Sequence, residues 1–287
     1  MSQSPSSAPV HSLPVLPRRS FGQTTRKDMW WIVPLLTFIG LGTFVVYSTW
    51  AALKGDHFAY GPYLSPFYSP LLFGSSGVHH GWFGEWPGWY PRHWLPASAA
   101  VLILWAPGGF RFTCYYYRGA YYKAFWADPI SCAVGEPRKK YLGEKTFPLI
   151  LQNVHRYFMY LAVVFLFLLL WDVISSMHFH NKDYYDPIVG RGYSFGIGVG
   201  TVILAVNLFL LTMYTFGCHS LRHLIGGRKD EISKASAGCQ KAYSCVTCLN
   251  KRHMLFAWCS LFTVGFCDLY IRMCSMGIWH DHVWRIF

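Results

Sequence analysis

The apolar positions of this 287-residue chain fall into five long runs, separated by polar or aromatic loops. A helix needs about 20 mostly apolar residues to cross the hydrocarbon core of a bilayer. The runs predict membrane-spanning helices at about residues 30–53, 93–117, 150–174, 194–218 and 253–276. We therefore expect an all-α, polytopic membrane protein with five transmembrane helices.

Two of these runs carry small or helix-breaking residues. Residues 107–109 (Pro-Gly-Gly) predict a kink or local break in the second span. Gly196, Gly198 and Gly200 begin the fourth span, where their small surface would let a neighbouring helix approach closely.

The segments outside the apolar runs complete a three-part organisation. Residues 1–28 begin with a stretch rich in Ser and Pro and predict a disordered cytoplasmic tail. Residues 29–277 form the five-helix transmembrane domain, and residues 278–287 a short outer-face tail. Within the domain, the loop from 54 to 92 is dense in Trp, Tyr, Pro and Gly, which predicts a cap at headgroup level on the outer face.

Composition and charge support a membrane class and give the orientation. The chain is 53% hydrophobic and only 13% charged, which is too apolar for an ordinary soluble domain. Its formal net charge of +12 does not indicate nucleic-acid binding, because Lys and Arg cluster at the ends of apolar runs. No cleavable signal peptide precedes the first run. The basic residues favour a cytoplasmic N-terminus and an outer C-terminus.

Four histidines lie at one depth in this topology, at the cytoplasmic ends of three spans. They are His155 at the start of the third span, His219 and His223 at the end of the fourth, and His253 at the start of the fifth. Haem b in a helical bundle needs two neutral imidazoles on opposite faces and cations near its propionates. Arginines adjoin these histidines at Arg156, Arg222 and Arg252. We therefore expect a haem-binding bundle.

The choice of ligands follows from helix geometry. His219 and His223 are four residues apart on one helical face, so they cannot ligate one haem from both sides. Adjacent antiparallel helices pack only about 8–10 Å apart. We therefore predict His155 and His253 as the haem-iron pair, with His219 next. For most of these residues taken singly, a solvated position beside an arginine is the better interpretation, and only their common depth favours ligation.

The nine cysteines are interpreted without a cofactor. Five lie within or at the edges of apolar helices, where cysteine behaves as a small hydrophobic residue; they are Cys114, Cys218, Cys259, Cys267 and Cys274. Cys239, Cys245 and Cys248 include a C-x-x-C motif in a cytoplasmic loop. Because a fourth ligand at ordinary spacing is missing, we expect free thiols there.

The inner end of the second span is the predicted quinone site. Tyr hydroxyls, Trp indoles and Arg groups are the donors that a quinone carbonyl oxygen requires at an interface. The candidate residues are Arg111, Tyr115, Tyr116, Arg118, Trp126 and Asp128. Arg118 is the first choice, because a cation is needed there only if something accepts it. An aromatic belt that only anchors the helix is the alternative.

At five strings the sequence resembles a known family, the single-chain membrane-anchor cytochrome b subunit of succinate dehydrogenase (respiratory complex II) found in mycobacteria and their relatives. The strings are residues 109–122 (GFRFTCYYYRGAYY), 132–137 (CAVGEP), 147–158 (FPLILQNVHRYF), 218–223 (CHSLRH) and 251–258 (KRHMLFAW). The resemblance implies one or two b haems, menaquinone or another quinone as substrate, and location in the bacterial plasma membrane.

The resemblance also implies partners. An iron–sulfur subunit, itself attached to a flavoprotein that oxidises succinate, is expected to dock on the cytoplasmic face, and the complex could form a higher oligomer. Basic residues on that face suit an acidic partner, although they would also serve to set topology. They are Arg118, Lys123, Arg138, Lys139, Lys140, Arg228, Lys229 and Lys251. The alternative function is a haem-free transporter or channel that uses its histidines as a proton relay.

Overall fold

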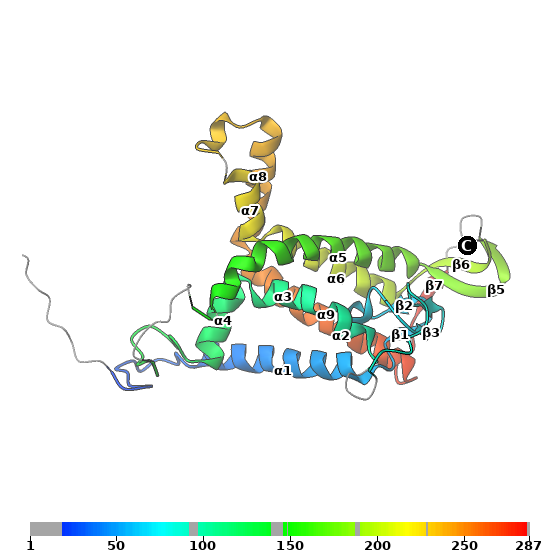
Figure 1. Cartoon of the computed structure of the whole chain (residues 1–287), viewed down its shortest axis with the longest axis horizontal. Coiled ribbons are helices and arrows are strands. Elements are labelled where there is room, and N and C mark those ends of the chain that lie inside the picture. The colour runs from blue at the N-terminus through cyan, green and yellow to red at the C-terminus, as the bar shows by residue number, and fades with distance from the viewer. Residues whose placement is uncertain are drawn as a thin grey trace, which may run out of the picture. The chain divides into compact units, whose positions relative to one another are not determined.

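Four long helices dominate the chain (Figure 1). The computed structural model describes residues 19–91, 97–138, 146–147, 149–186, 190–227 and 229–285, except for the side chains of 149, 181–186, 190, 191, 193 and 285. The long helices are α1 (Ile32–Lys54), α5 (His155–Ser175), α6 (Val199–Phe216) and α9 (His253–Ser275). Each is apolar and long enough to cross a membrane when the preceding 3₁₀ helix η2 (Leu149–Val154) is counted with α5. Four of the five predicted spans are therefore present as continuous helices.

The second predicted span is not one helix. Residues 92–96 lie outside the described residues, and the remainder forms α2 (Ala99–Ile103), α3 (Trp105–Phe112) and α4 (Tyr115–Phe125). The first break falls at Leu104, three residues before Pro107 and not at residues 107–109. Pro107 has no N–H for the carbonyl of Ile103 and its ring crowds that carbonyl, so the helix interrupts there and restarts with proline in its first turn.

The fourth predicted span begins later than its glycines suggested. Strand β5 (His178–Asp186) pairs antiparallel with β6 (Gly190–Gly198), and β7 (Val283–Arg285) adds to β6. Helix α6 starts only at Val199. Gly200 makes room for the side chain of Tyr63 and not for a neighbouring helix, because a Cβ at position 200 would stand 2.7 Å from the Tyr63 ring. The expectation of a purely α-helical fold was therefore wrong at this end of the helices, which we call the outer end because the sequence predicted that orientation.

The aromatic loop after α1 folds over the outer ends of the helices. It contains strands β1 (Ala59–Tyr60) and β2 (Tyr63–Leu64), the 3₁₀ helix η1 (Pro66–Tyr68), and strands β3 (Ser75–Ser76) and β4 (His79–His80). Its segment from Tyr63 to Leu71 is buried and packs with Ala51, Ala52, Ala99 and Ala100 as a hydrophobic core. The predicted aromatic cap is thus a packed layer.

The C-terminal residues also belong to this outer layer. Asp281 accepts hydrogen bonds from the hydroxyls of Tyr63 at 2.5 Å and Tyr270 at 2.7 Å. Its other contact is the backbone N–H of Gly200 at 3.1 Å. The residues after Gly277 are therefore anchored to the helical domain, and β7 extends its sheet.

At the opposite end, helices replace two predicted features. The fourth span ends at Phe216, and α7 (His219–Gly226) begins after a break at Gly217 and Cys218. The 3₁₀ helix η3 (Ile232–Lys234) and α8 (Ala237–Lys251) occupy what was expected to be a basic loop. Helix α8 carries the C-x-x-C motif, and all nine cysteines of the chain are free thiols.

A smaller unit is formed by the described parts of residues 1–38 and 120–141, and the rest of the chain forms the larger unit. In the smaller unit, Gly22 and Gln23 exchange backbone hydrogen bonds with Gly135, and Arg26 donates to Ser131 at 2.9 Å. The described part of the expected N-terminal tail, residues 19–28, is therefore paired with the segment around Gly135. Residues 1–18 lie outside the described residues.

Candidate functional site

Four side chains with metal-ligating atoms meet at one end of the larger unit, and each sits at a helix boundary. Cys114 lies between α3 and α4, and Cys218 is the N-cap of α7. His155 is the first residue of α5, and His253 is the first residue of α9. The helix breaks bring residues from four parts of the sequence to one place. We call these four residues the Cys–His quartet.

The quartet is held together by two imidazole–sulfur contacts. The Nε2 atom of His155 lies 3.1 Å from the sulfur of Cys218, and the Nε2 atom of His253 lies 3.5 Å from the sulfur of Cys114. The four donor groups therefore form two imidazole–sulfur pairs, His155 with Cys218 and His253 with Cys114.

Thr113 fixes the tautomer of His155. Its hydroxyl donates to the carbonyl of Gly109 at 2.7 Å and also contacts Nδ1 of His155 at 2.8 Å. A hydroxyl has one proton to give, so the Nδ1–H of His155 is the donor in the second contact. The Nε2 atom then carries the lone pair that faces Cys218, which is the tautomer that a metal ligand requires.

Aromatic rings bury the quartet on its inner side. Phe110 stacks on His155 and Tyr214 stacks on His253, each with 4.9 Å between ring centroids. His155 is 3% exposed and Cys218 is 1% exposed. Burial raises the pKa of the Cys218 thiol to about 11, so without a metal this sulfur is protonated. Nδ1 of His253 is buried and, within the described residues, has no hydrogen-bond partner.

The quartet has the donor set of an iron centre but not of a single-ion site. No three His, Cys, Asp or Glu side chains among the described residues converge on a point that would hold one ion. The donors instead form two pairs. In a binuclear iron–sulfur cluster of the Rieske type, two cysteines hold one iron and two histidines hold the other, so the two sulfurs would share one iron and the two imidazoles the other.

The predicted histidines share a cavity but differ in burial. His155, His219, His223 and His253 all line one cavity of about 940 Å³, together with Arg156. His219 and His223 are exposed on α7, with 5.0 Å between their ring centroids. Burial, with His223 and Arg222 nearby, lowers the pKa of His219. The structure therefore separates His155, which is buried, and His253, which is half-buried, from two exposed histidines at the cavity rim.

The three predicted arginines differ in their surroundings. Arg156 lines the polar cavity and is exposed. Arg222 donates from Nε to the hydroxyl of Thr247 at 3.2 Å and lies over the ring of Tyr243. Arg252 is an exposed residue between α8 and α9. Arg156 is thus the one of these three that lines the cavity with the histidines.

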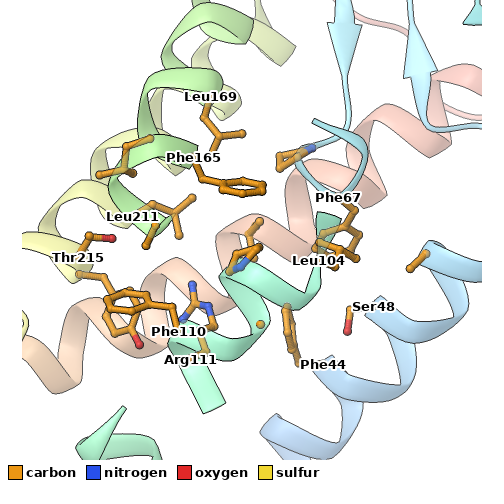
Figure 2. Close-up of a pocket in the computed structure, with 18 of the residues that line it drawn as sticks. Phe44, Ser48, Phe67, Leu104, Phe110, Arg111, Phe165, Leu169, Leu211 and Thr215 are labelled. Atoms are coloured by element: carbon orange, nitrogen blue, oxygen red, sulfur yellow. The ribbon is translucent and has the colours of Figure 1, made fainter. Parts of the chain in front are cut away.

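A second, apolar cavity of about 380 Å³ lies beyond the stacked rings (Figure 2). Phe110 and Tyr214, which cover the quartet, also line this cavity. Arg111 is its charged residue, and its guanidinium lies 4.7 Å from the centroid of the Tyr214 ring. One layer of aromatic side chains therefore separates the quartet from the apolar cavity.

The six predicted quinone residues are distributed over different places. Arg111 lines the apolar cavity, whereas Tyr115 and Tyr116 line the polar one. Arg118 lines neither of these two cavities, and its guanidinium lies over the ring of Tyr115 at 5.2 Å. Trp126 and Asp128 belong to the smaller unit, where Arg138 contacts both of them. Within the larger unit, the structure does not bring the predicted set to one point.

The sequence interpretation missed Cys114 and Cys218 as site residues. Cys114 follows the polar residue Thr113, and Cys218 follows the small residue Gly217. This position at the end of an apolar run was the available signal. Their apolar surroundings favoured a structural role, because burial alone does not distinguish a ligand from a packed thiol. Only the pairing of each sulfur with an imidazole makes the distinction.

Comparisons with known proteins give concordant results. The family model described as actinobacterial succinate dehydrogenase subunit SdhC matches residues 32–277. Among solved structures, a chain of the Mycobacterium smegmatis Sdh1 complex in the apo form is similar, with a TM-score of 0.81 and 40% sequence identity. The alignment covers 96% of this chain and 97% of that one. The curated proteins contain no match to the chain.

Proposed function

Because the chain belongs to the actinobacterial SdhC family of succinate dehydrogenase subunits, we propose that it carries electrons from an iron–sulfur subunit to a membrane quinone. It is a membrane anchor of that oxidoreductase, and the transporter alternative is not favoured. The observation that supports the electron-transfer role is the buried Cys–His quartet. Buried unpaired donors at a membrane face are costly unless they serve a ligand.

The cofactor that best suits the quartet is a binuclear iron–sulfur cluster. Cys114 and Cys218 would supply thiolates, and His155 and His253 would supply neutral imidazoles. The Thr113 contact already holds His155 in the required tautomer. Such a cluster supplies one-electron transfer, which zinc in the same ligand set would not.

Haem b, which the sequence predicted, is the second candidate. His155 and His253 would be its axial ligands, as predicted. However, each Nε2 atom faces a sulfur within 3.5 Å, where the iron and macrocycle would have to lie. Haem binding therefore requires both cysteine side chains to move away, whereas a cluster uses them.

The soluble partners dock at the end that carries the quartet in this proposal. The polar cavity is open on that side and is lined by His219, His223, Arg156 and Lys251. An iron–sulfur subunit seated over it, with its flavoprotein, would bring its own clusters close to the quartet. The N-terminus is then cytoplasmic. Lys139, Lys140 and Arg228, which were predicted to assist docking, lie outside the described residues.

Cofactor analysis of the purified complex tests the proposal. We expect iron and acid-labile sulfide in excess of what the partner's clusters hold, and an additional paramagnetic signal on reduction with succinate. The double variant Cys114→Ser, Cys218→Ser should lose that signal and quinone reduction, but should retain succinate oxidation with a soluble artificial acceptor. Cys239→Ser, Cys248→Ser is the matched control and should retain all three properties.

The same preparation decides between the two candidates. Sharp visible bands of a bis-histidine haem, retained in Cys114→Ser, Cys218→Ser and lost in His155→Ala, would reject the cluster in favour of haem. A complex that transfers no electrons from succinate to quinone would reject the proposed function as a whole.

A further inference from the structure

A third cavity, of about 320 Å³, lies at the outer end of the helical domain, between the aromatic cap and α5. Its lining joins His79 and Trp82 of the cap to Trp171 and Asp172 of α5. Asp172 follows His155 by 17 residues, so at 1.5 Å per residue it lies about 25 Å along α5 from the quartet end. The hydrocarbon core of a bilayer is about 30 Å thick, so this cavity lies near the headgroups of the leaflet opposite the quartet.

Asp172 brings a carboxylate to this cavity without a cation beside it. Its Oδ2 atom is buried and has no hydrogen-bond partner within the described residues. None of the ion pairs between described residues includes Asp172. The residue also lies in the last turn of α5, where the helix dipole disfavours negative charge. A carboxylate in this position is costly unless a positive group faces it.

His79 contributes a second unpartnered atom to the same cavity. Its Nε2 atom is buried and lacks a hydrogen-bond partner in the described part of the chain. Its ring makes hydrogen bonds with the backbone at Gly61 and Tyr63, and these bonds favour the protonated ring, as bonds to carbonyls do. Because Nε2 has no partner, Nδ1 makes them as the donor. The Nε2 atom of neutral His79 therefore carries a lone pair.

The two unpartnered atoms define the chemistry of the ligand. Oδ2 of Asp172 and Nε2 of His79 are both acceptors, so the ligand has to donate hydrogen bonds, and a positive charge would compensate the carboxylate. A primary ammonium has three N–H donors and one positive charge. The exposed indoles of Trp82 and Trp171 offer ring faces that attract such a cation. Among the described residues, no three His, Cys, Asp or Glu side chains could hold a metal ion, so the cavity lacks the ligand set of a metal site.

The position of the cavity on α5 indicates where the ammonium comes from. Trp171, which lines the cavity, also belongs to an exposed apolar stripe with Val164 and Phe167. Spacings of three and four residues place these side chains on one helical face. In a membrane, that face contacts acyl chains. A ligand that joins an ammonium to acyl chains therefore reaches the cavity directly from the bilayer.

We propose that this cavity binds the ammonium headgroup of an aminophospholipid from the outer leaflet. One N–H of the ammonium donates to Oδ2 of Asp172, and another donates to Nε2 of His79. The acyl chains lie along α5 beside Trp171. The bound lipid joins the aromatic cap to α5, and its binding does not depend on the electron-transfer role proposed above.

A lipid titration of the assembled complex tests this proposal. The delipidated complex in detergent is titrated with short-chain phosphatidylethanolamine or short-chain phosphatidylcholine, and bound lipid is counted by native mass spectrometry. Phosphatidylethanolamine should bind more tightly, because the choline headgroup has the same charge but no N–H donor. Asp172→Asn should raise the half-saturating concentration of the tightest phosphatidylethanolamine site about ten-fold, as expected for loss of a hydrogen bond to a charged group.

Glu85→Gln is the matched control, because Glu85 is an exposed carboxylate of the cap that does not line this cavity. This variant should bind phosphatidylethanolamine as the unaltered complex does. Succinate oxidation with a soluble artificial acceptor should be unchanged in both variants, which shows that they assemble. A phosphatidylethanolamine with a photoreactive diazirine near its glycerol should label the segments around Trp82 or Trp171 in the unaltered complex.

Equal affinity of the unaltered complex and Asp172→Asn for phosphatidylethanolamine would overturn the proposal, and so would equal affinity for the two lipids. Labelling that avoids both segments would also overturn it, and this measurement gives an answer even if Asp172→Asn does not assemble. Free ethanolamine is the remaining arm. If it displaced the lipid at the concentration at which the lipid itself binds, the ligand would be a soluble amine, and the lipid assignment would be wrong.

Discussion

The two halves of the helical domain each contain an arginine among packed side chains, but the surroundings of its charge differ. Arg272 of α9, in the outer half, is 1% exposed and lies 3.3 Å from both Asp268 and Asp56. Arg111, in the half that contains the quartet, contacts only neutral acceptors and aromatic rings within the described residues.

The difference separates stability from function. The outer network is nearly complete, because Asp268 also accepts from the hydroxyls of Tyr47 at 2.7 Å and Ser65 at 2.6 Å. Around the quartet, Nδ1 of His253 and the hydroxyl of Tyr214 are buried without partners in the described structure. Satisfied buried groups rigidify a fold, whereas an unsatisfied buried group requires an explanation, of which a ligand is one.

The largest expected effect comes from breaking the outer pair. Asp268→Asn removes the buried partner of Arg272 and leaves only the partly exposed carboxylate of Asp56, and removal of one partner of a buried pair costs about 3–5 kcal/mol. We expect a corresponding loss in the free energy of unfolding, measured by thermal melting of the purified complex in detergent. The control Asp56→Asn alters a carboxylate that is 44% exposed and should cost less than about 1 kcal/mol. Equal effects of the two variants would contradict a buried structural pair.

Arg111→Met should change the stability of the protein little and lower its quinone turnover strongly. Removal of an unpaired cation from an apolar site relieves a desolvation cost, so melting should change little. Arg111 is the charged residue of the apolar cavity. Its loss should lower quinone turnover about 100-fold, equivalent to about 2.7 kcal/mol. Melting and turnover measured on one preparation separate the two effects. A large loss of stability with normal turnover would assign Arg111 a structural role.

Close packing in the outer layer gives an intermediate effect. A Cβ at position 200 would stand 2.7 Å from the ring of Tyr63, and that ring is fully buried. Gly200→Ala should therefore destabilise the protein by about 1–3 kcal/mol through overpacking. Gly42→Ala, where nothing lies within 4 Å, should not destabilise it. Identical melting temperatures for the two variants would show that Tyr63 moves aside without cost.

The smallest expected effect depends on pH and concerns His79 in the aromatic cap. Burial lowers the pKa of His79, and its Nε2 atom has no partner in the described structure. As the pH falls through the ordinary value of about 6.5, the unfolded chain binds a proton that the folded protein does not, so stability decreases.

His79→Gln should reduce the loss of stability between neutral and mildly acidic pH by less than about 1 kcal/mol. Melting curves at pH 7.5 and 5.5, conditions chosen on either side of about 6.5, provide the measurement. An equal loss of stability in His79→Gln and the unaltered protein would contradict the prediction.

The apolar runs determined most of the helical architecture, because about 20 apolar residues in succession have few alternatives to a membrane helix. Four spans were predicted within a few residues, and the family resemblance carried by residues 109–122 and 147–158 agrees with the comparisons. The predicted position of the break in the second span was wrong, since a proline interrupts a helix before its own position and not at it. The glycines from 190 to 198 lie in a strand that pairs with the neighbouring β5 and with β7 from the C-terminal end of the chain.

The site divides in the same way. The sequence alone singled out His155 and His253 as candidates, because polar side chains at a membrane depth stand out against apolar neighbours. It could not identify Cys114 and Cys218, because a thiol in an apolar run has the same composition whether it packs or ligates. Two contacts made the quartet: one joins residues that are 63 positions apart in the sequence, and the other joins residues that are 139 positions apart. The same folding placed Arg111 at the apolar cavity instead of at the interface. Sequence patterns encode depth and periodicity, but only tertiary structure decides which side chains at one depth face each other.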